Sequence, residues 1–371
     1  MSHEMMPFID LAAQYRDTRA DIDAGIQRVL DHGRYIMGPE VTEMEAALAD
    51  YTGGGNCISV SSGTEALLIA MMALGIGCGD EVITTPFTFA ATAEMIVLAG
   101  ATPVFVDIES DTCNIDARLI ADKITPRTRA IIPVSLYGQP ADMDEIAQLA
   151  KAHNIAVIDD AAQSFGADYK GRKSCSLATI SCTSFFPSKP LGCYGDGGAI
   201  FTADDALAQA CREIRVHGQS ERYVHTRVGV GGRMDTLQCA VILGKLSRFD
   251  WEIEQRLAIG ARYNDLLDAA GIGRVVQRDD RTSVYAQYTV FVRNRAAVQD
   301  ALKIAGVPTA VHYPLPLNRQ PAYSNISGGG ATPRSESAAA TVMSLPMHPY
   351  LCVEDQDRVV AALVEALRGT N

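Results

Sequence analysis

The sequence lacks the long apolar runs and the basic surface that mark membrane-spanning and nucleic-acid-binding proteins. Its longest apolar stretches, such as Ala130–Val134 and Ala66–Leu74, are much shorter than the roughly 20 residues that a bilayer span needs. The formal net charge of the 371 residues is -12, whereas nucleic acids and anionic membranes favour basic surfaces. We therefore expect no membrane segment and no nucleic-acid partner, and an anionic ligand has to be met by local groups.

Recognisable metal motifs and secretion signals are missing as well. The 9 cysteines are odd in number and never spaced as C-x-x-C, and the 7 histidines show no H-x-x-x-H or H-E-x-x-H spacing. These patterns predict reduced, mostly buried thiols and no metal site. Residues 1–10 have no basic flank ahead of an apolar core, so we expect no signal peptide and a cytoplasmic protein.

Short apolar runs do alternate with helical patterns between residues 56 and 203. Runs of Ile and Val without alternation indicate strands that are buried on both faces, as in a mostly parallel sheet covered by helices. The expected strands are Cys57–Val60, Glu81–Thr84, Thr102–Val106, Ala130–Val134, Ala156–Asp159, Ala178–Phe185 and Gly198–Thr202. The expected helices between them are Thr64–Leu74, Ala90–Leu98 and Met143–His153. This alternation predicts an α/β fold.

The pattern of predicted elements changes after a long helical pattern from Asp235 to about Leu267. Shorter elements follow it, at Tyr288–Val292, Ala297–Ala305 and Thr309–His312. We therefore predict two domains, a large one over residues 1–250 and a smaller α/β domain over residues 251–371.

Lys189 is the most informative residue of the chain. It lies between a serine-bearing, strand-like run and a glycine-rich turn, Tyr194-Gly195-Asp196-Gly197-Gly198. A lysine that forms an imine with a carbonyl cofactor needs small neighbours, hydroxyl groups for a phosphate and a backbone free to bend. A solvated surface lysine is the alternative for Lys189 alone.

Three further positions support an imine-forming role for Lys189. They follow strands, and ligands of such sheets lie at the carboxyl ends of the strands. Ser62-Gly63-Thr64 opens a helix after the first strand, as a phosphate seat or an ordinary helix cap does. Asp160 and Gln163 follow a later strand, and an N-cap is the alternative for the carboxylate. Phe89 stands at a loop-to-helix junction, where core packing is the alternative. Together with Lys189, this set matches what pyridoxal 5'-phosphate requires: an imine-forming lysine, an anion for the ring nitrogen, a donor to the ring hydroxyl, a stacking ring and a phosphate cup.

Across nearly its whole length the chain resembles the DegT/DnrJ/EryC1/StrS family of sugar-nucleotide aminotransferases. The matching stretches are residues 38–41, 62–67, 79–83, 157–164 and 184–198. Within the family it is most similar to the WbpE/WlbC type, which acts on UDP-2-acetamido-2-deoxy-ribo-hexuluronate, through residues 183–202, 283–288 and 311–314. The resemblance implies the aspartate aminotransferase fold (type I), with a large domain built on a mostly parallel mixed sheet and a smaller C-terminal domain, in a homodimer with shared active sites.

The resemblance also implies the roles of individual residues. Lys189 is the Schiff-base lysine and proton shuttle, Asp160 pairs with the pyridinium nitrogen, and Gln163 meets the ring hydroxyl. Phe89 stacks on the ring, while Gly63, Thr64 and Ser184 hold the phosphate. Glutamate is the implied amino donor; it converts the cofactor to pyridoxamine 5'-phosphate, whose amine then passes to C3 of a UDP-linked keto-uronic sugar for a lipopolysaccharide O-antigen.

By the same resemblance, six residues contact the nucleotide sugar: Gly33, Tyr35, Ser188, Arg233, His312 and Tyr313. Charge gives separate support for Arg233, because residues 203–233 contain five arginines and no lysine in an acidic chain, and guanidinium groups suit carboxylates and diphosphates. Salt bridges on a helix face are the alternative for Arg212 and Arg215. A packed core residue is the alternative for His312.

The chain departs from the family at two positions. Gly231 stands where relatives carry an asparagine that reaches across the dimer to the cofactor phosphate, so a hydrogen bond worth roughly 1.5 to 3 kcal/mol is expected to be missing. Ser135 stands where many relatives have histidine.

Three other functions are compatible with the same fold. The sugar dehydratases of this family carry histidine in place of the imine lysine, so Lys189 argues against them. Amination of another nucleotide-linked keto-sugar, at C4, is a second possibility. The third is a non-catalytic nucleotide-sugar-binding regulator; for this function, Gly231 in place of the family asparagine indicates a loss of catalytic activity.

Overall fold

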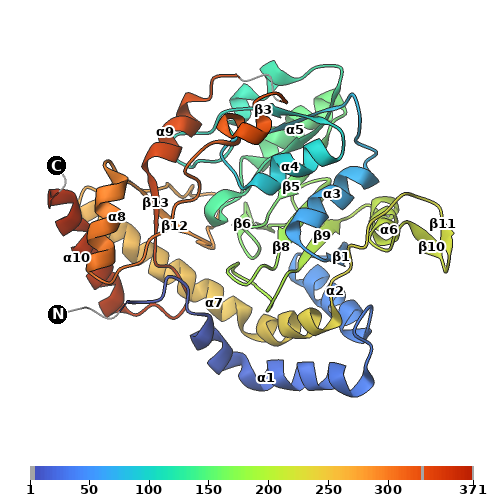
Figure 1. The fold of residues 1–371 in the computed structure, drawn as a ribbon, viewed down its shortest axis with the longest axis horizontal. Helices are drawn as coiled ribbons and strands as arrows, with labels where there is room; N and C mark the ends of the chain where they lie inside the picture. Colours follow the sequence, from blue (N-terminus) through green and yellow to red (C-terminus); the bar gives the residue numbers. More distant parts are fainter. Residues whose placement is uncertain (1–4, 327–329, 370–371) are drawn as a thin grey trace.

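A seven-stranded sheet forms the centre of the molecule (Figure 1). The structure, a computed structural model, describes residues 5–326 and 330–369. The strands lie in the order β1-β9-β8-β5-β4-β2-β3. Their bounds are β1 Asn56–Val60, β2 Glu81–Thr84, β3 Thr102–Phe105, β4 Thr128–Ile132, β5 Ala156–Asp160, β8 Ile180–Ser184 and β9 Gly198–Thr202. Only β9 runs antiparallel to its neighbours, so the mostly parallel mixed sheet that the sequence predicts is confirmed.

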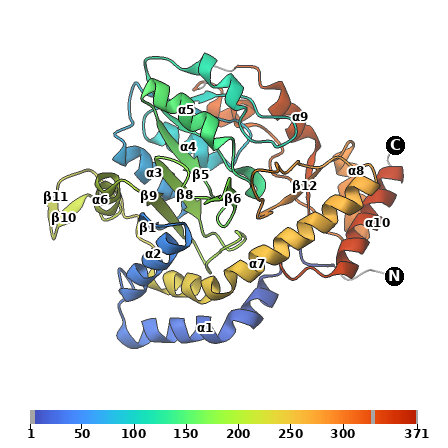
Figure 2. The ribbon, with the colours of Figure 1, turned by 180° about the vertical axis from the view of Figure 1, so that it is seen from behind.

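Helices cover both faces of this sheet. One face is covered by α3 (Gly63–Ala73), α4 (Ala90–Leu98) and α6 (Asp205–Ile214). The other is covered by α2 (Pro39–Tyr51), α5 (Met143–His153) and α7 (Thr236–Ala269), with α1 (Leu11–His32) packed along α7 (Figure 2). The apolar side chains of the strands enter both layers, which explains why these strands read as continuous rather than alternating apolar runs.

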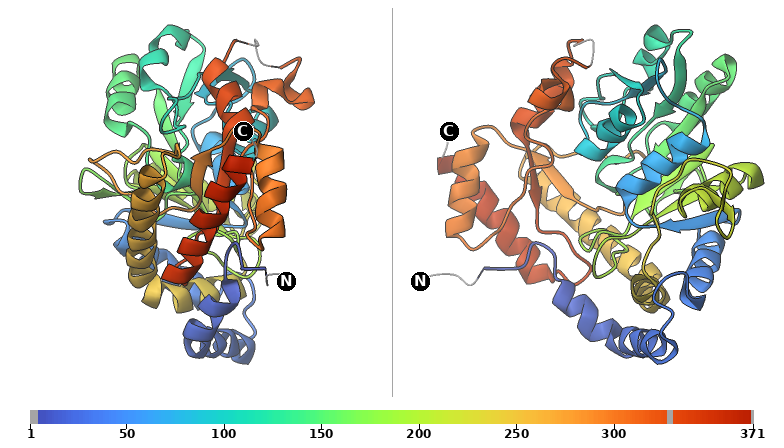
Figure 3. Two further views of the ribbon diagram at one scale, coloured as in Figure 1. Left: turned by 90° about the vertical axis from the view of Figure 1, so that its left-hand side faces the viewer. Right: turned by 45° about the vertical axis from the view of Figure 1, so that its right-hand side comes forward.

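A smaller unit contains the two-stranded antiparallel sheet of β12 (Tyr288–Phe291) and β13 (Val342–Leu345). The helices α8 (Arg295–Ile304) and α10 (Val353–Gly369) pack on each other at its outer side (Figure 3), and α9 (Pro333–Thr341) leads into β13. Its core joins these elements to the C-terminal half of α7 through Tyr263 and Leu267. Thr309–His312, expected as a further short element, forms no strand; its backbone pairs with β13 through a single bridge from Ala310 to Ser344.

The remaining elements are short. They are the strand pairs β6 (Asp168–Tyr169) with β7 (Arg172–Lys173) and β10 (Gln219–Glu221) with β11 (Val224–His225), and the 3-10 turns Ala117–Leu119, Ala121–Lys123, Leu136–Gly138, Leu317–Arg319 and Pro321–Tyr323.

Sequence and structure agree closely in the sheet. Each predicted strand is present with its ends shifted by no more than two residues, and each predicted helix likewise. The boundary predicted between residues 250 and 251 lies inside α7, which continues across it, and the division into domains stays a prediction. All nine cysteines are free, and all but Cys78 and Cys352 are buried. In the described part of the chain, no helix combines the length and the apolar character needed to cross a membrane.

Phe165 connects the sheet to the helices below it. Its ring lies 5.4 Å from that of Tyr51 in α2, 6.0 Å from those of Phe185 and Phe201, and 5.7 Å from that of Phe249 in α7. The side chain is buried. One ring therefore contacts the end of β8, strand β9 and two helices.

We predict that Phe165→Ala lowers the free energy of unfolding by about 3 to 5 kcal/mol, because it leaves a cavity that rigid neighbours cannot fill. Urea denaturation followed by circular dichroism measures this. Leu98→Ala is the control, since Leu98 is largely exposed and the change should stay within about 0.5 kcal/mol. Equal losses in the two variants would contradict this role of Phe165.

Candidate active site

The predicted site residues meet at the carboxyl edge of the central sheet. Asp160 is the last residue of β5, and Lys189 lies in the turn between β8 and β9. The segments that follow β1 and β2 supply Gly63 and Phe89. Because parallel strands end at a common edge, positions far apart in sequence are brought together there.

Lys189 and Asp160 form the charged centre of the site. Burial lowers the pKa of Lys189 to about 8, and the negative charge of Asp160 acts in the opposite direction. Burial also raises the pKa of Asp160, while a hydrogen bond from Thr92, the charge of Lys189 and the backbone N–H of Ala162 oppose that shift. An amine whose pKa approaches neutrality can exchange protons and attack a carbonyl.

Asp160 is fixed by neighbours on two sides. The hydroxyl of Thr92 in α4 donates to Oδ2 at 2.8 Å, and the N–H of Ala162 donates to Oδ1 at 3.3 Å. Thr88 lies 3.0 Å from Thr92, hydroxyl to hydroxyl. These donors favour the ionised carboxylate, the form that pairs with a protonated ring nitrogen.

Gln163 is oriented by two tyrosines. Its Oε1 accepts a hydrogen bond from the backbone N–H of Tyr137 at 2.7 Å, so its amide NH2 points the other way, 3.3 Å from the hydroxyl of Tyr313. The ring of Tyr313 lies 6.1 Å from that of Phe89, which is largely exposed. Gln163, Tyr313 and Phe89 thus lie together and present an amide donor and two rings.

The expected phosphate seat is formed where α3 begins beside the end of β8. Ser62 caps α3, and its Oγ accepts from the N–H of Glu65 at 3.1 Å. The N–H groups of Gly63 and Thr64 precede that bond, at the positive end of the helix dipole. A Cβ on Gly63 would lie 2.6 Å from the Cβ of Ser184, so only glycine permits this approach.

His312 has both a structural and a site contact. Its Nδ1 lies 3.2 Å from the hydroxyl of Ser344, and its carbonyl accepts from the hydroxyl of Tyr137. Burial and the charge of Lys189 both lower the pKa of His312. The bond to Ser344 is what a packed histidine requires, and the charge interaction places the ring near Lys189.

Arg233 differs from the other four arginines of residues 203–233. Arg215 pairs with Glu45, Arg227 with Glu213, Arg212 donates to Asn56, and the guanidinium of Arg222 lies 5.1 Å from the ring centroid of Tyr223. Among the described residues, no hydrogen bond or ion pair satisfies the guanidinium of Arg233. The carbonyl of the preceding Gly232 accepts from the N–H of Ser61 at 2.8 Å, so Arg233 lies close to the start of α3.

For the other predicted substrate residues the structure shows no hydrogen bond or ion pair with Lys189 or Asp160 within the described part of the chain. Tyr35 is half-exposed, and its carbonyl accepts from Thr236 at 2.9 Å, three residues beyond Arg233. Gly33 ends α1 in the left-handed conformation, with φ 67°. Ser188 directly precedes Lys189 and is partly buried. The roles of Gly33, Tyr35 and Ser188 stay predictions.

The two departures from the family have different surroundings. Gly231 is exposed, and a side chain there would meet the ring of His217 at 3.1 Å. The hydroxyl of Ser135 donates to Oδ1 of the buried Asp159 at 3.0 Å, and burial raises the pKa of Asp159 to about 7. Ser135 therefore contacts the carboxyl that adjoins Asp160 in the strand.

Two residues of the site were missed in the sequence. Thr92 follows Phe89 by three positions, one helical turn, and this spacing was a signal that its hydroxyl faces the same region as the ring. Tyr137 gave no such signal, because its contacts to Gln163 and His312 cross between distant parts of the chain.

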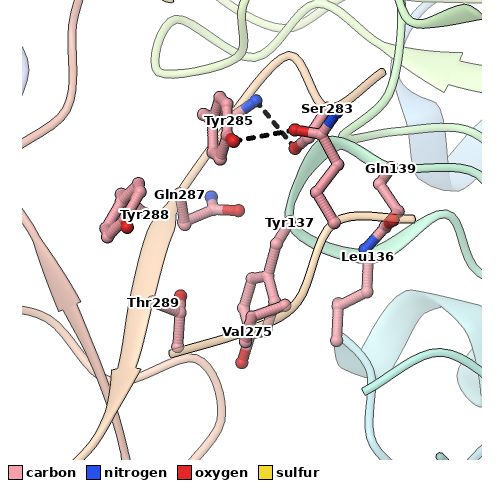
Figure 4. Close-up of a pocket in the computed structure, with 10 residues that line it drawn as sticks. Leu136, Tyr137, Gln139, Val275, Ser283, Tyr285, Gln287, Tyr288 and Thr289 are labelled. Atoms are coloured by element: carbon pink, nitrogen blue, oxygen red, sulfur yellow. Dashed lines mark hydrogen bonds between the residues drawn. The ribbon is translucent and has the colours of Figure 1, made fainter. Parts of the chain in front are cut away.

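A separate cavity of about 20 Å³ lies behind Tyr137 (Figure 4). It is lined by Tyr137 and Gln139 on one side and by Gln287 and Thr289 on the other. Gln287 points into it, and its Oε1 has no partner within the described residues. The space suits about one water molecule, which would satisfy that oxygen, and it is too small for an organic cofactor.

The donor set at the strand ends fits pyridoxal phosphate. Lys189 offers an amine for its carbonyl, the anion of Asp160 suits its ring nitrogen, and the amide of Gln163 suits its phenolic oxygen. The free N–H groups at the start of α3 suit its phosphate.

Comparison with known proteins agrees with this fit. Residues 16–364 match the model of the DegT/DnrJ/EryC1/StrS aminotransferase family. The chain is 58% identical over 359 residues to the UDP-2-acetamido-2-deoxy-3-oxo-D-glucuronate aminotransferase of Pseudomonas aeruginosa, covering 97% of this chain and 99% of the relative. It is 44% identical over 368 residues to the pleiotropic regulatory protein of Geobacillus stearothermophilus, covering 98% and 99%.

Solved structures share the complete fold. The crystal structure of S. venezuelae DesV in complex with a ketimine intermediate superposes with a TM-score of 0.95 at 41% identity, covering 98% of both chains. The predicted aminotransferase fold and the predicted dependence on pyridoxal phosphate are thereby confirmed.

We predict that Thr92→Val weakens the binding of pyridoxal phosphate about 10- to 100-fold, because a hydrogen bond to a charged group is lost. The hydroxyl of Thr92 lowers the pKa of Asp160, so its loss raises that pKa and the anion disappears at a higher pH on acidification. Equilibrium dialysis as a function of pH measures both effects. Thr92→Ser keeps the hydroxyl and serves as the control; wild-type binding by the valine variant at every pH would refute the prediction.

Proposed function

The chain belongs to the DegT/DnrJ/EryC1/StrS aminotransferase family, and we propose that it moves an amino group from glutamate to C3 of a UDP-linked 3-keto N-acetyl hexuronic acid. The product is an amino sugar for a surface polysaccharide, the lipopolysaccharide O-antigen. The reaction takes place in the cytoplasm. Support for the sugar comes from the Pseudomonas aeruginosa relative, which is named as the aminotransferase of this sugar.

The observation that carries this substrate is the free guanidinium of Arg233. Its four neighbours in the sequence segment are engaged by protein groups, whereas Arg233 keeps its charge available beside the start of α3. A planar guanidinium binds a carboxylate through two parallel hydrogen bonds. A uronic acid carries such a carboxylate, and a neutral hexose does not.

Within this reaction each of the predicted site residues has its own role. When bound, pyridoxal phosphate supplies a carbonyl for the amine and a protonated ring that takes up an electron pair. Lys189 holds and moves the proton at the carbon that bears the amine, and Asp160 remains an anion to keep the ring nitrogen protonated. Gln163 and Phe89 orient the ring, and Gly63, Thr64 and Ser184 hold its phosphate.

We further propose that the active enzyme is a homodimer with shared active sites. Large apolar side chains are exposed next to Lys189 in sequence, on the protruding β10–β11 hairpin (Figure 2) and just after it: Phe186 is 52% exposed, Tyr223 76% and Val228 85%. Exposed apolar side chains gathered on one region are typical of protein interfaces. A partner subunit would cover them.

We expect glutamate to convert the bound cofactor to the pyridoxamine form with one 2-oxoglutarate released per site. Absorbance spectroscopy and mass spectrometry follow the two products, and addition of a UDP-linked 3-keto uronic sugar should then give an aminated sugar. Lys189→Arg should slow the conversion about 100-fold or more, because the proton carrier is lost.

Two outcomes would contradict this function. An amine at C4 of the product, located by NMR, would favour the other keto-sugar reaction. Absence of conversion with any amino acid would favour a non-catalytic nucleotide-sugar-binding regulator; the Geobacillus stearothermophilus relative is named a pleiotropic regulatory protein.

We predict that Arg233→Ala raises KM for the uronic acid about 10- to 100-fold, since about 1.5 to 3 kcal/mol of charge-assisted bonding is lost. The neutral hexose analogue should lose far less. Arg212→Ala is a matched control, because it removes an arginine that already bonds to Asn56. Equal losses for the acid and the hexose would exclude carboxylate binding by Arg233.

A further inference from the structure

Lys245 in α7 is a lysine buried almost completely, with 1% exposure. Its ammonium donates to the carbonyl of Gly192 at 2.6 Å and lies 4.3 Å from the ring centroid of Tyr194. Within the described residues, no carboxylate lies within ion-pair distance of it. Burial of a lysine is costly unless its donors are directed at specific partners, so this carbonyl and this ring are the groups that offset its cost.

Both of these partners belong to the loop that connects Lys189 to β9. A second side chain of α7 holds the same loop: Oε1 of Gln238 accepts from the N–H of Tyr194 at 2.8 Å, and its Nε2 donates to the Tyr194 carbonyl at 3.3 Å. Gln238 and Lys245 are seven residues apart, which places them on one face of the helix. The helix therefore grips the loop at two points.

The loop folds back tightly onto the segment that precedes Lys189. The N–H of Cys193 donates to the carbonyl of Phe185 at 2.7 Å, and the N–H of Lys189 donates to that of Phe186 at 2.8 Å. A Cβ on Gly192 would lie 2.6 Å from the carbonyl oxygen of Pro187. A shift of Gly192 would therefore displace the backbone on both sides of Lys189.

The surroundings of the Lys245 ammonium within α7 and α1 are also ordered. Glu252, seven residues further along α7, favours the charged form of Lys245, and Cys193 does so more weakly. The amide of Gln14 in α1 donates to both oxygens of Glu252, at 2.9 and 2.8 Å. Burial acts against these groups and lowers the pKa of Lys245 to about 8. A methionine of similar length would fill the same space at little cost, which leaves the directed bond to Gly192 as the property that distinguishes lysine.

We propose that Lys245 is a positioning residue: by binding the carbonyl of Gly192 it fixes the loop around Lys189 and holds the Lys189 amine in its buried place beside Asp160. The inference rests on the proposed function only for the role of Lys189 as the imine-forming residue.

Competitive acetylation tests this in the full-length chain after any bound pyridoxal phosphate has been removed, so that Lys189 carries a free amine. Only the neutral amine reacts, so the pH midpoint of Lys189 labelling, read by mass spectrometry, reports its pKa. In the wild-type chain we expect a midpoint near 8. In Lys245→Met it should move toward 10.5, the ordinary value, because a loosened loop admits water to Lys189. The groups that otherwise act on this amine, Asp160 and His312, are unchanged in the variant.

Three further variants separate the bond from other effects. Gln238→Leu removes the second grip without changing charge and should raise the midpoint too, which excludes simple loss of a nearby cation as the cause. Lys245→Arg retains a charged donor and should keep a midpoint closer to the wild-type value than Lys245→Met does. Lys151→Met, at an exposed position of α5, should leave the midpoint unchanged.

An unchanged midpoint in a cooperatively folded Lys245→Met variant would overturn the proposal, as would equal shifts in the methionine and arginine variants. If Lys245→Met fails to fold, a wild-type midpoint in Gln238→Leu overturns it equally. The labelling requires no turnover, so failure of glutamate conversion in the wild-type chain would reject the proposed function while leaving this measurement intact.

Discussion

The site depends on two opposite charges, the buried Asp160 at the end of β5 and the partly buried Lys189 after β8. Burial raises the pKa of Asp160 and lowers that of Lys189, whereas their mutual attraction acts against both shifts. A buried pair of this kind persists only if further polar groups compensate for lost hydration. Thr92 and the backbone of Ala162 do this for Asp160. The charge of Asp160 acts on the Lys189 amine, and within the described residues no hydrogen bond or ion pair holds its nitrogen, which keeps it available for exchange.

The same constraint explains why so much of the chain converges on one edge of the sheet. β5 carries Asp160, β8 leads to Lys189, α4 supplies Thr92, and the smaller unit contributes Tyr313 through its contact with Gln163. β5, β8 and α4 share one apolar cluster, whereas Tyr313 packs against another. The geometry of the site is therefore set by the relative packing of several layers, and close-packed cores hold such distances firmly.

Sequence alone predicted the parts of this arrangement that are local. Continuous apolar runs predicted the strands, and the first polar residue after such a run lies at the end of the strand, which is why Asp160 was found. Lys189 was found from the serine-bearing run and the glycine-rich turn that flank it. Thr92, Tyr137 and Lys245 were not, because their partners lie 68, 26 and 53 residues away along the chain. Periodicity assigns such residues to a face of an element, but the neighbour on that face is decided by tertiary packing.

Because the net charge is -12, the chain can bind an anionic ligand only where positive groups are placed locally. Most arginines are already neutralised by carboxylates, as Arg215 is by Glu45 and Arg281 by Asp142 and Asp280. Near the site, the N–H groups that open α3 and the guanidinium of Arg233 meet no carboxylate within the described residues, so they can attract an anion. These lie close together, since Ser61 bonds to the residue before Arg233. Positive groups gathered in one region of an acidic chain attract an anionic ligand to that region, and two separate groups there favour a ligand with more than one anionic group.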